Sequence, residues 1–104
     1  MATRSALLIR TETGDWLSHY CHFDGYPEHM LPALASADPA AILRGREIRQ
    51  IRADGTVEAF GKPRTASRLS LPVWPEWVAH VYVLTAAGWV HAATPEELAA
   101  IVTP

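Results

Sequence analysis

The sequence contains only one cysteine, Cys21, and no long run of hydrophobic residues. A single cysteine cannot form an intramolecular disulfide, which agrees with a reducing compartment. Apolar runs such as Ala6–Ile9 are a few residues long, whereas a membrane-spanning helix needs about 20 apolar residues and a signal peptide an apolar region of about 7–15. We therefore expect a cytoplasmic protein that neither spans a membrane nor is exported.

Several sequence signatures of known chemistry are also missing. There is no glycine-rich phosphate loop, no helix-turn-helix pattern, no aromatic pattern typical of an RNA-binding sheet and no recognised zinc-ligand spacing. The net charge of −2 does not favour nucleic acid as a partner. These absences favour a protein that is not an enzyme, uses no cofactor and does not bind nucleic acid, although they leave the enzymatic and nucleic-acid alternatives open.

The composition is that of an ordinary folded protein. Of the 104 residues, 49% are hydrophobic and 19% are charged, which provides enough apolar material for one core. A chain of this length has a common size for a single domain and buries roughly two-thirds of its unfolded surface. We find no internal repeat, linker or low-complexity tract, so residues 1–104 are predicted to form one domain.

The first third of the chain predicts a β-hairpin followed by a sharp corner. Residues 6–10 and 16–23 are β-prone runs separated by a glycine-containing turn. In the second run, alternate side chains share a face that we assign to the core, namely Leu17, His19, Cys21 and Phe23. The segment Asp24–Pro27 then ends the strand, because Gly25 allows a positive φ and Pro27 forces extended geometry on Tyr26.

Two short helices and a polar hairpin are predicted next. The first helix covers about residues 28–37. The second covers residues 40–44, because Asp38 followed by proline is a favourable helix start. An Asp-Gly pair between the β-prone runs 47–52 and 56–60 indicates a tight turn. This part of the chain therefore predicts two helices and a second hairpin.

The last part of the chain predicts a loop, a third hairpin and a final helix. Residues 61–77 contain three prolines and no clear period, which is typical of a loop with at most one short strand. The runs 78–85 and 89–93 flank a turn with Gly88, and residues 94–97 form a capping box with proline at the first helical position. The predicted fold class is α+β, with an antiparallel sheet of about five to six strands in three hairpins and two or three short helices on one face.

The segment Tyr20–Glu28 reads Tyr-Cys-His-Phe-Asp-Gly-Tyr-Pro-Glu. It resembles the hallmark of a family of small, largely uncharacterised phage and prophage proteins, Tyr-Cys-His-Trp-Asp-Gly-Tyr-Pro-Glu, and matches eight of the nine residues, with Phe23 in place of the tryptophan. The similarity extends loosely to the hairpin before the segment, the helix after it and a closing hairpin with an aromatic residue, here Trp89. The resemblance implies a mobile-element origin and an accessory role.

Small phage accessory proteins frequently bind and block a host protein, such as a component of a CRISPR or other defence system. By this analogy, the predicted function is binding to a bacterial host protein and inhibiting or modulating it, as an anti-CRISPR-like inhibitor does. The expected compartment is the cytoplasm of the bacterial host. A homodimer formed through an open strand edge is a further possibility.

Six chemically capable residues lie close together in the sequence, namely His19, Cys21, His22, Asp24, Glu28 and His29. Strand alternation sends Cys21 and His22 to opposite faces, so one metal ion can reach only some of the six. The weak candidates for a metal-dependent enzyme are His22, Asp24 and His29. We predict that Cys21 packs as a small buried hydrophobe rather than acting as a nucleophile, and we assign no catalytic residue.

The predicted partner-binding residues come from three parts of the chain. They are Tyr26, Arg46, Arg49, Arg52, Trp74 and Trp77. Between Arg44 and Arg68 lie seven of the nine basic residues and only three of the eleven acidic ones. This region could contact phosphate or an acidic protein, and its interleaved acidic residues favour an exposed hairpin or a protein partner over nucleic acid. The two tryptophans lie in a proline-rich loop, and tryptophan is enriched at interface hot spots.

Overall fold

The computed structural model describes residues 3–45, 47–59, 67–69, 73–75 and 78–102. Their helices and strands are, in chain order, β1 (Ser5–Arg10), β2 (Trp16–Cys21), α1 (Pro27–Ser36), α2 (Pro39–Gly45), β3 (Ile48–Ile51), β4 (Val57–Ala59), β5 (Ser67–Leu69), β6 (His80–Thr85), β7 (Gly88–Ala92) and α3 (Pro95–Val102). The α+β class and the three predicted hairpins are confirmed, and β5 is the one strand that the structure describes within residues 61–77.

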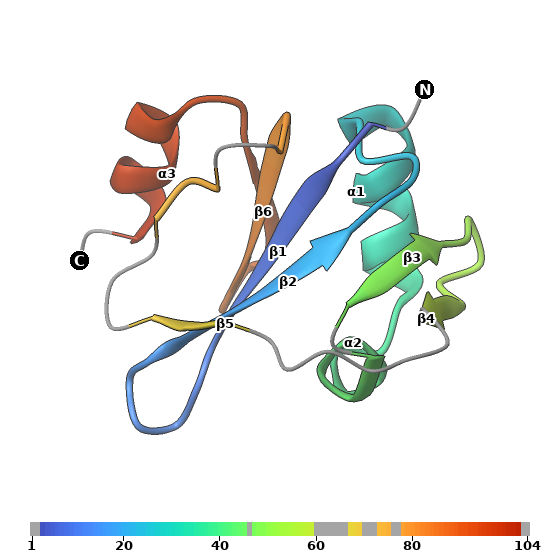
Figure 1. Cartoon of the computed structure of the whole chain (residues 1–104), viewed down its shortest axis with the longest axis horizontal. Coiled ribbons are helices and arrows are strands. Elements are labelled where there is room, and N and C mark those ends of the chain that lie inside the picture. Colours follow the sequence, from blue (N-terminus) through green and yellow to red (C-terminus); the bar gives the residue numbers. More distant parts are fainter. Residues whose placement is uncertain (1–2, 46, 60–66, 70–72, 76–77, 103–104) are drawn as a thin grey trace.

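All of these strands belong to one sheet, with β1 near its centre (Figure 1). The strand order is β4-β3-β2-β1-β6-β7, and β5 pairs with β2 as well. β1 pairs antiparallel with β2, from Ser5 opposite Cys21 to Arg10 opposite Trp16. On its other side, β1 pairs parallel with β6, from Ser5 opposite His80 to Leu8 opposite Val83. Two distant parts of the chain are thus joined at the N-terminal strand.

The prediction of an antiparallel sheet is only partly right: the pairs within the three hairpins are antiparallel, but the hairpins are joined to one another by parallel pairs. Cys21 of β2 is the parallel partner of Ile48 of β3, and the pairing continues where the amides of His22 and Phe23 donate to the carbonyls of Ile48 and Arg49. A crossover connection through α1 and α2 returns the chain in the same direction, as parallel strands require. The sheet is therefore mixed.

The prediction that the helices lie on one face is also wrong, since α1 and α2 cover one face of the sheet and α3 covers the other (Figure 1). Successive residues of β1 enter different cores: Leu7 packs with residues of α1, α2 and β3, whereas Leu8 packs with Leu98 of α3. Because neighbouring side chains of a strand point to opposite faces, the continuous apolar run in β1 supplies both cores.

β2 is likewise buried on both faces over part of its length. Cys21 and His19 are buried, as predicted. Trp16 alternates with the residues assigned to the core face and was therefore expected on the outer face, but it is buried in the core under α3 and is 8% exposed. Leu17, assigned to the core face, is only half-buried. A sheet covered on one side only would have left Trp16 in solvent, so its burial follows from the second helical layer.

The helix ends follow local rules that were visible in the sequence. α1 begins at Pro27, where the missing amide hydrogen costs no helical bond. The carboxylate of Asp38 accepts a hydrogen bond from the amide of Ala40 at 3.0 Å and caps α2. At the start of α3, the Thr94 hydroxyl accepts a hydrogen bond from the amide of Glu97 at 3.1 Å. In return, the Glu97 carboxylate accepts a hydrogen bond from the amide of Ala93 at 2.6 Å.

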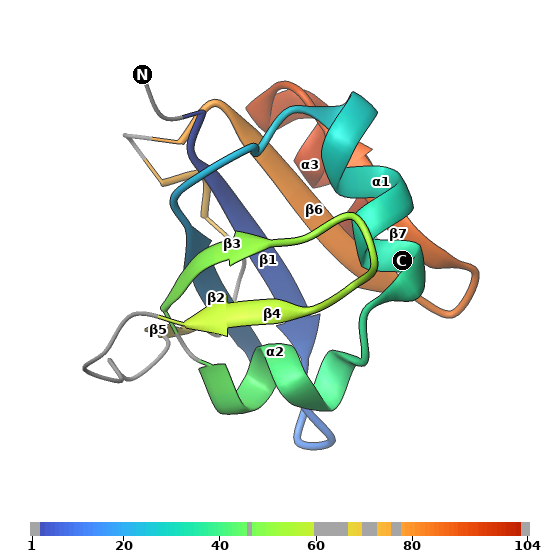
Figure 2. The same ribbon diagram turned by 90° about the vertical axis from the view of Figure 1, so that its right-hand side faces the viewer.

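The β3–β4 hairpin lies at the side of the molecule, with α1 above it and α2 below it in the view of Figure 2. Ile48 and Ile51 are fully buried against the two helices, whereas Arg49 and Arg52 point to solvent. Ile48 and Ile51 are three residues apart and share the core face because the β3–β4 register shifts between Ile48 and Gln50. The hairpin thus forms one wall of the core and one exposed charged surface. Within the part of the chain that the structure describes, no helix is long and apolar enough to cross a membrane.

Candidate functional site

The corner between β2 and α1 is shaped by Asp24 rather than by the positive φ predicted for Gly25. Asp24 has a φ of +56°, and it is the only non-glycine residue with a positive φ among the described residues. Aspartate tolerates this left-handed conformation better than most side chains. Its carboxylate accepts a hydrogen bond from the side-chain amide of Gln50 in β3 at 2.5 Å. The corner is thereby attached to the polar hairpin.

Gly25 is required for close packing against the N-terminal strand. A Cβ atom at this position would lie 2.6 Å from the carbonyl oxygen of Thr3 and 2.9 Å from Cβ of Ser5. The Gly25 amide donates to that Thr3 carbonyl at 2.9 Å, and the Gly25 carbonyl accepts from the buried hydroxyl of Tyr82 at 2.6 Å. The glycine therefore lets the corner bond at the same time to Thr3, just before β1, and to Tyr82 of β6.

The three weak metal candidates, His22, Asp24 and His29, engage three different partners. Nδ1 of His22 lies 2.7 Å from the Tyr20 hydroxyl, Asp24 binds Gln50, and Nε2 of His29 lies 2.7 Å from the carbonyl oxygen of Ile51. A carbonyl oxygen only accepts, so this His29 nitrogen carries a hydrogen and presents no lone pair to a metal. Among the described residues, no three or more His, Cys, Asp or Glu side chains are grouped to hold a metal ion.

Cys21 is placed as a buried core residue. Its side chain is fully buried, and its thiol donates weakly to the carbonyl of Phe23 with an S···O distance of 3.7 Å. Burial raises the pKa of the thiol to about 11, so at neutral pH it is protonated, and a nucleophile requires the thiolate. This environment agrees with the packing role predicted for Cys21.

The end of β2 and the β3–β4 hairpin share a continuous array of half-buried rings and exposed charged groups, which we call the motif–hairpin surface. It consists of Tyr20, His22, Phe23, Arg49, Arg52 and Glu58. The His22 and Phe23 rings meet edge to face, with centroids 4.5 Å apart, and the guanidinium of Arg49 lies 5.7 Å from the Phe23 centroid. The array therefore connects the segment Tyr20–Glu28 to the basic hairpin through direct contacts.

The charges of this surface are not balanced. Arg49 and Arg52 both contact the Glu58 carboxylate, at 3.6 and 2.9 Å, while their side chains remain 55% and 58% exposed. One carboxylate thus faces two guanidinium groups. Such exposed pairs contribute little to folding stability, but they hold the arginines in place and leave most of their hydrogen-bond donors in solvent.

The remaining predicted partner-binding residues lie elsewhere. Tyr26 is 40% exposed at the start of α1, with its ring centroid 6.0 Å from that of His29. Trp74 is half-buried: its indole N–H donates to the carbonyl of Val78 at 3.3 Å, and its ring packs against the core under α3. This assigns Trp74 a structural role. Arg46 and Trp77 lie outside the described residues.

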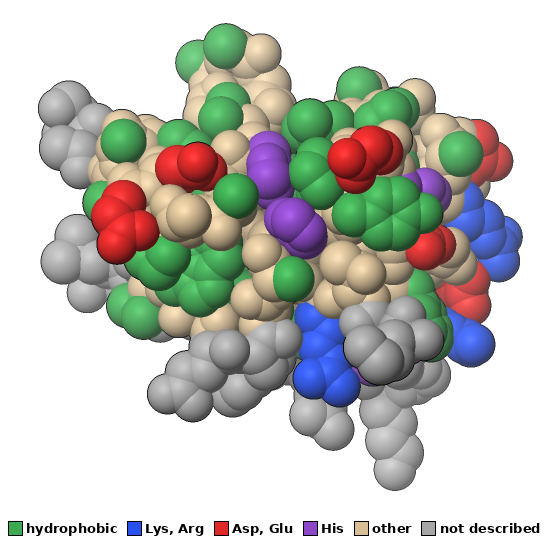
Figure 3. Space-filling model, turned by 90° about the horizontal axis from the view of Figure 1, so that it is seen from above, with side chains coloured by type: hydrophobic (Ala, Val, Ile, Leu, Met, Phe, Trp, Pro, Cys, Tyr) green, Lys and Arg blue, Asp and Glu red, His purple; other side chains and the backbone are tan. Residues whose placement is uncertain are grey.

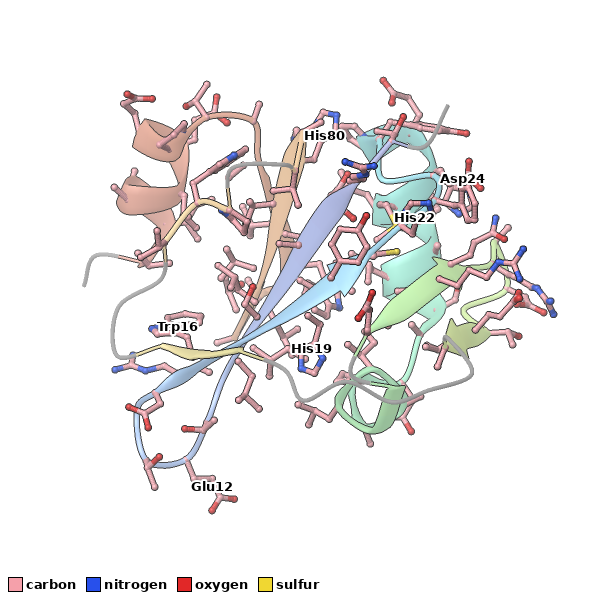
Figure 4. The ribbon with its side chains drawn as sticks, viewed as in Figure 1. Glu12, Trp16, His19, His22, Asp24 and His80 are labelled. Atoms are coloured by element: carbon pink, nitrogen blue, oxygen red, sulfur yellow. The ribbon has the colours of Figure 1, made fainter. Side chains whose placement is uncertain are left out.

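Sequence inspection missed a pair of histidines, His80 and His91, at the same end of the sheet. Figure 4 places His80 at the end of the molecule where His22 and Asp24 also lie, whereas Trp16 and Glu12 lie toward the opposite end. Nδ1 of His80 and Nε2 of His91 are 2.8 Å apart. Burial, together with the neighbouring His91, lowers the pKa of His80, and the charge of Glu28 acts in the opposite direction. Both residues belong to the third hairpin, whose two β-prone runs were predicted from the sequence without assigning their faces.

Comparison with known proteins provides no further assignment. No family model matches the chain, and neither a curated protein nor a solved structure matches it. Function is therefore argued from the arrangement of the chain's own residues.

Proposed function

We propose that this chain is a phage-derived accessory protein that binds a bacterial host protein and inhibits or modulates it through the motif–hairpin surface. The observation that carries the proposal is the contact series from His22 through Phe23 to Arg49. It joins the segment that resembles the phage family to the hairpin whose arginines were predicted to bind a partner. The segment and the hairpin thereby provide one surface rather than two separate features.

The physical character of this surface favours a protein partner with acidic side chains. Arginine and aromatic rings are enriched in the residues that dominate binding energy at protein interfaces. Two arginines share one glutamate here, so an acidic group of a partner can pair with the donors that Glu58 leaves free. Complementary charge of this kind accelerates association and selects the partner.

A role in binding also fits the chemical groups around the surface. The Cys21 thiol is buried and protonated, and the His29 and Asp24 side chains form hydrogen bonds within the fold. The surface is formed by aromatic rings and by two arginines that share one carboxylate, which are groups that recognise a protein partner. An anti-CRISPR-like inhibitor of host defence is one form that this role takes, proposed by analogy with other small phage proteins.

Affinity purification from a host lysate tests the proposal. The tagged wild-type chain is compared with the Arg49→Glu/Arg52→Glu double variant and with Arg10→Glu, which reverses an exposed arginine on a different strand. We expect one host protein to be recovered by the wild type and by Arg10→Glu but lost with the double variant. Circular dichroism spectra of all three proteins verify that they remain folded.

A second variant gives the opposite expected effect. Glu58→Gln removes the carboxylate that contacts both arginines, so binding to an acidic partner should strengthen, and the gain should shrink as salt is added. The affinity of the purified partner for each variant, measured by calorimetry at two salt concentrations, checks this. Equal affinity for the wild type and the double charge reversal would show that the motif–hairpin surface is not the binding site.

A further inference from the structure

His80 of β6 and His91 of β7 are diagonal neighbours on one face of a strand pair. His91 lies directly opposite Tyr82 in the antiparallel register, so His80 is the residue two positions along on the same face. Their ring centroids are 4.9 Å apart, and the facing nitrogens, Nδ1 of His80 and Nε2 of His91, are 2.8 Å apart. The two imidazoles are held together by paired strands rather than by a loop.

Both rings reach the surface. Each side chain is half-buried, and Figure 3 shows histidine side chains in the middle of the face seen from above, with acidic side chains to either side. The Tyr82 ring packs beside His91 with centroids 5.1 Å apart, and its hydroxyl is bonded to the Gly25 carbonyl. Tyr82 therefore helps to orient His91 without competing for its nitrogens.

The facing nitrogens form a hydrogen bond in which one ring donates and the other supplies a lone pair. Each neutral ring has one hydrogen and one lone pair, so moving the donor's hydrogen to its outer nitrogen turns both inner nitrogens into ligands. Two imidazole nitrogens bound to one tetrahedral zinc ion are separated by roughly 3.3 Å, given Zn–N distances of about 2.0–2.1 Å. Binding therefore requires the two nitrogens, now 2.8 Å apart, to separate by about 0.5 Å and both rings to turn so that their lone pairs point to the same ion.

We propose that His80 and His91 form a two-histidine site for a divalent transition-metal ion of the zinc type, with water in the remaining coordination positions. Imidazole is a preferred ligand for zinc, copper and nickel. Glu28 in the first turn of α1 is the acidic residue whose charge acts on His80, and it partly compensates the charge of the ion. This site is separate from the motif–hairpin surface and does not depend on the proposed protein partner.

Titration of the metal-free protein with zinc chloride tests the site. Isothermal calorimetry measures the affinity and stoichiometry, and ¹H–¹⁵N spectra of the histidine rings identify the nitrogens that change. The variants are His80→Gln and His91→Gln, and the matched control is His29→Gln, whose amide can still donate to the Ile51 carbonyl that His29 contacts. Circular dichroism spectra establish that each variant is folded before titration.

We expect one zinc ion per chain to bind to the wild type and to His29→Gln, with the ring signals of His80 and His91 shifting. Each of the His80→Gln and His91→Gln variants should lose more than about tenfold in affinity, since even the partners that orient a ligand cost 10–100-fold when removed. Glu28→Gln should cause a smaller loss. Absence of zinc binding, or binding that survives both His80→Gln and His91→Gln, would overturn the proposal.

Discussion

The two faces of the sheet are stabilised by different kinds of interaction. Under α1 and α2, three buried or half-buried polar groups are each held by a specific bond: the Tyr82 hydroxyl by Gly25, the Cys21 thiol by Phe23 and the His29 ring by Ile51. Under α3, the buried residues are almost entirely apolar, namely Ala6, Leu8, Trp16, Val78, Val81, Val83, Ala92 and Leu98. The first face therefore adds specific hydrogen bonds to a core that is also mostly apolar, whereas the second depends mainly on filled volume.

This difference explains where the family-like segment lies. Its residues from Cys21 to Pro27 pass from the first core to the start of α1, where the backbone of Gly25 contacts both Thr3 and Tyr82. A position with fixed hydrogen-bond partners accepts few residue types, whereas an apolar core accepts many that conserve volume. The segment is therefore mainly an architectural corner whose outer side chains, His22 and Phe23, are available to a partner.

Among the variants that test this difference between the two faces, Gly25→Ala should have the largest effect on stability. The added Cβ would lie 2.6 Å from the Thr3 carbonyl, so the corner must move and the two hydrogen bonds of Gly25 must weaken. We expect a loss of about 3 kcal/mol or more in the free energy of unfolding, measured by urea denaturation. The control is Gly88→Ala, where a Cβ meets nothing within 4 Å but φ is +110°, and where the cost is about 1–2 kcal/mol. Equal losses in the free energy of unfolding for Gly25→Ala and Gly88→Ala would show that the close packing at Gly25 adds no stability of its own.

Leu98→Ala tests the apolar face. Leu98 of α3 is 3% exposed and belongs to the core with Leu8 and Val81. Its truncation should lower the free energy of unfolding by about 3 kcal/mol, through lost burial and a cavity. Because no bonded polar group is involved, the amide chemical shifts of His22 and Tyr26 on the other face should not change. Large shifts at the corner would mean that the two faces are not independent.

Alkaline pH should destabilise the first face through Cys21. Burial raises the pKa of its thiol from 9.0 to about 11, so the folded state holds the proton more tightly than the unfolded state does. The resulting stability is complete below about pH 9 and is lost as the pH rises towards 11, amounting to about 2–3 kcal/mol. Urea denaturation from pH 8 to 11 should therefore show a steeper fall for the wild type than for Cys21→Ala. Parallel curves for the two proteins would contradict this.

The smallest expected effect is that of Tyr82→Phe. This change keeps the ring in the core but removes the hydroxyl that donates to the Gly25 carbonyl at 2.6 Å. An unsatisfied buried acceptor costs about 1–3 kcal/mol, and we expect about 1.5 kcal/mol in urea denaturation. In the Gly25→Ala background the additional loss should be smaller, since the same bond is already weakened. If the losses of the two single variants add up fully in the double variant, Gly25 and Tyr82 stabilise the fold independently of each other.

The elements themselves could be predicted from the sequence because their signals are local. The proline at the start of α1, the cap at Asp38 and the Thr94 capping box each act within one helical turn, and the structure confirms all three. The Asp-Gly turn between β3 and β4 and the glycine turn before β7 are equally local. Signals of this kind identify hairpins and helix ends without information on the rest of the chain.

The arrangement of those elements could not be predicted, since it depends on pairs that are distant in sequence. Nothing near Ser5 indicates that it pairs with His80, and nothing near Phe23 indicates the contact with Arg49. The burial of Trp16 and the meeting of His80 with His91 depend likewise on which strands and helices become neighbours. The positive φ of Asp24 was assigned to Gly25 because glycine is the usual residue in that conformation.

The parallel pairing of β1 with β6 has a consequence for how the chain acquires its structure. β1 and β2 form a local hairpin, but the other edge of β1 is completed only by residues from His80 onward. During synthesis, that edge of β1 remains unpaired until β6 has also left the ribosome. Folding is therefore expected to be slow for a protein of this size, because this central strand pair joins residues that lie far apart in the sequence.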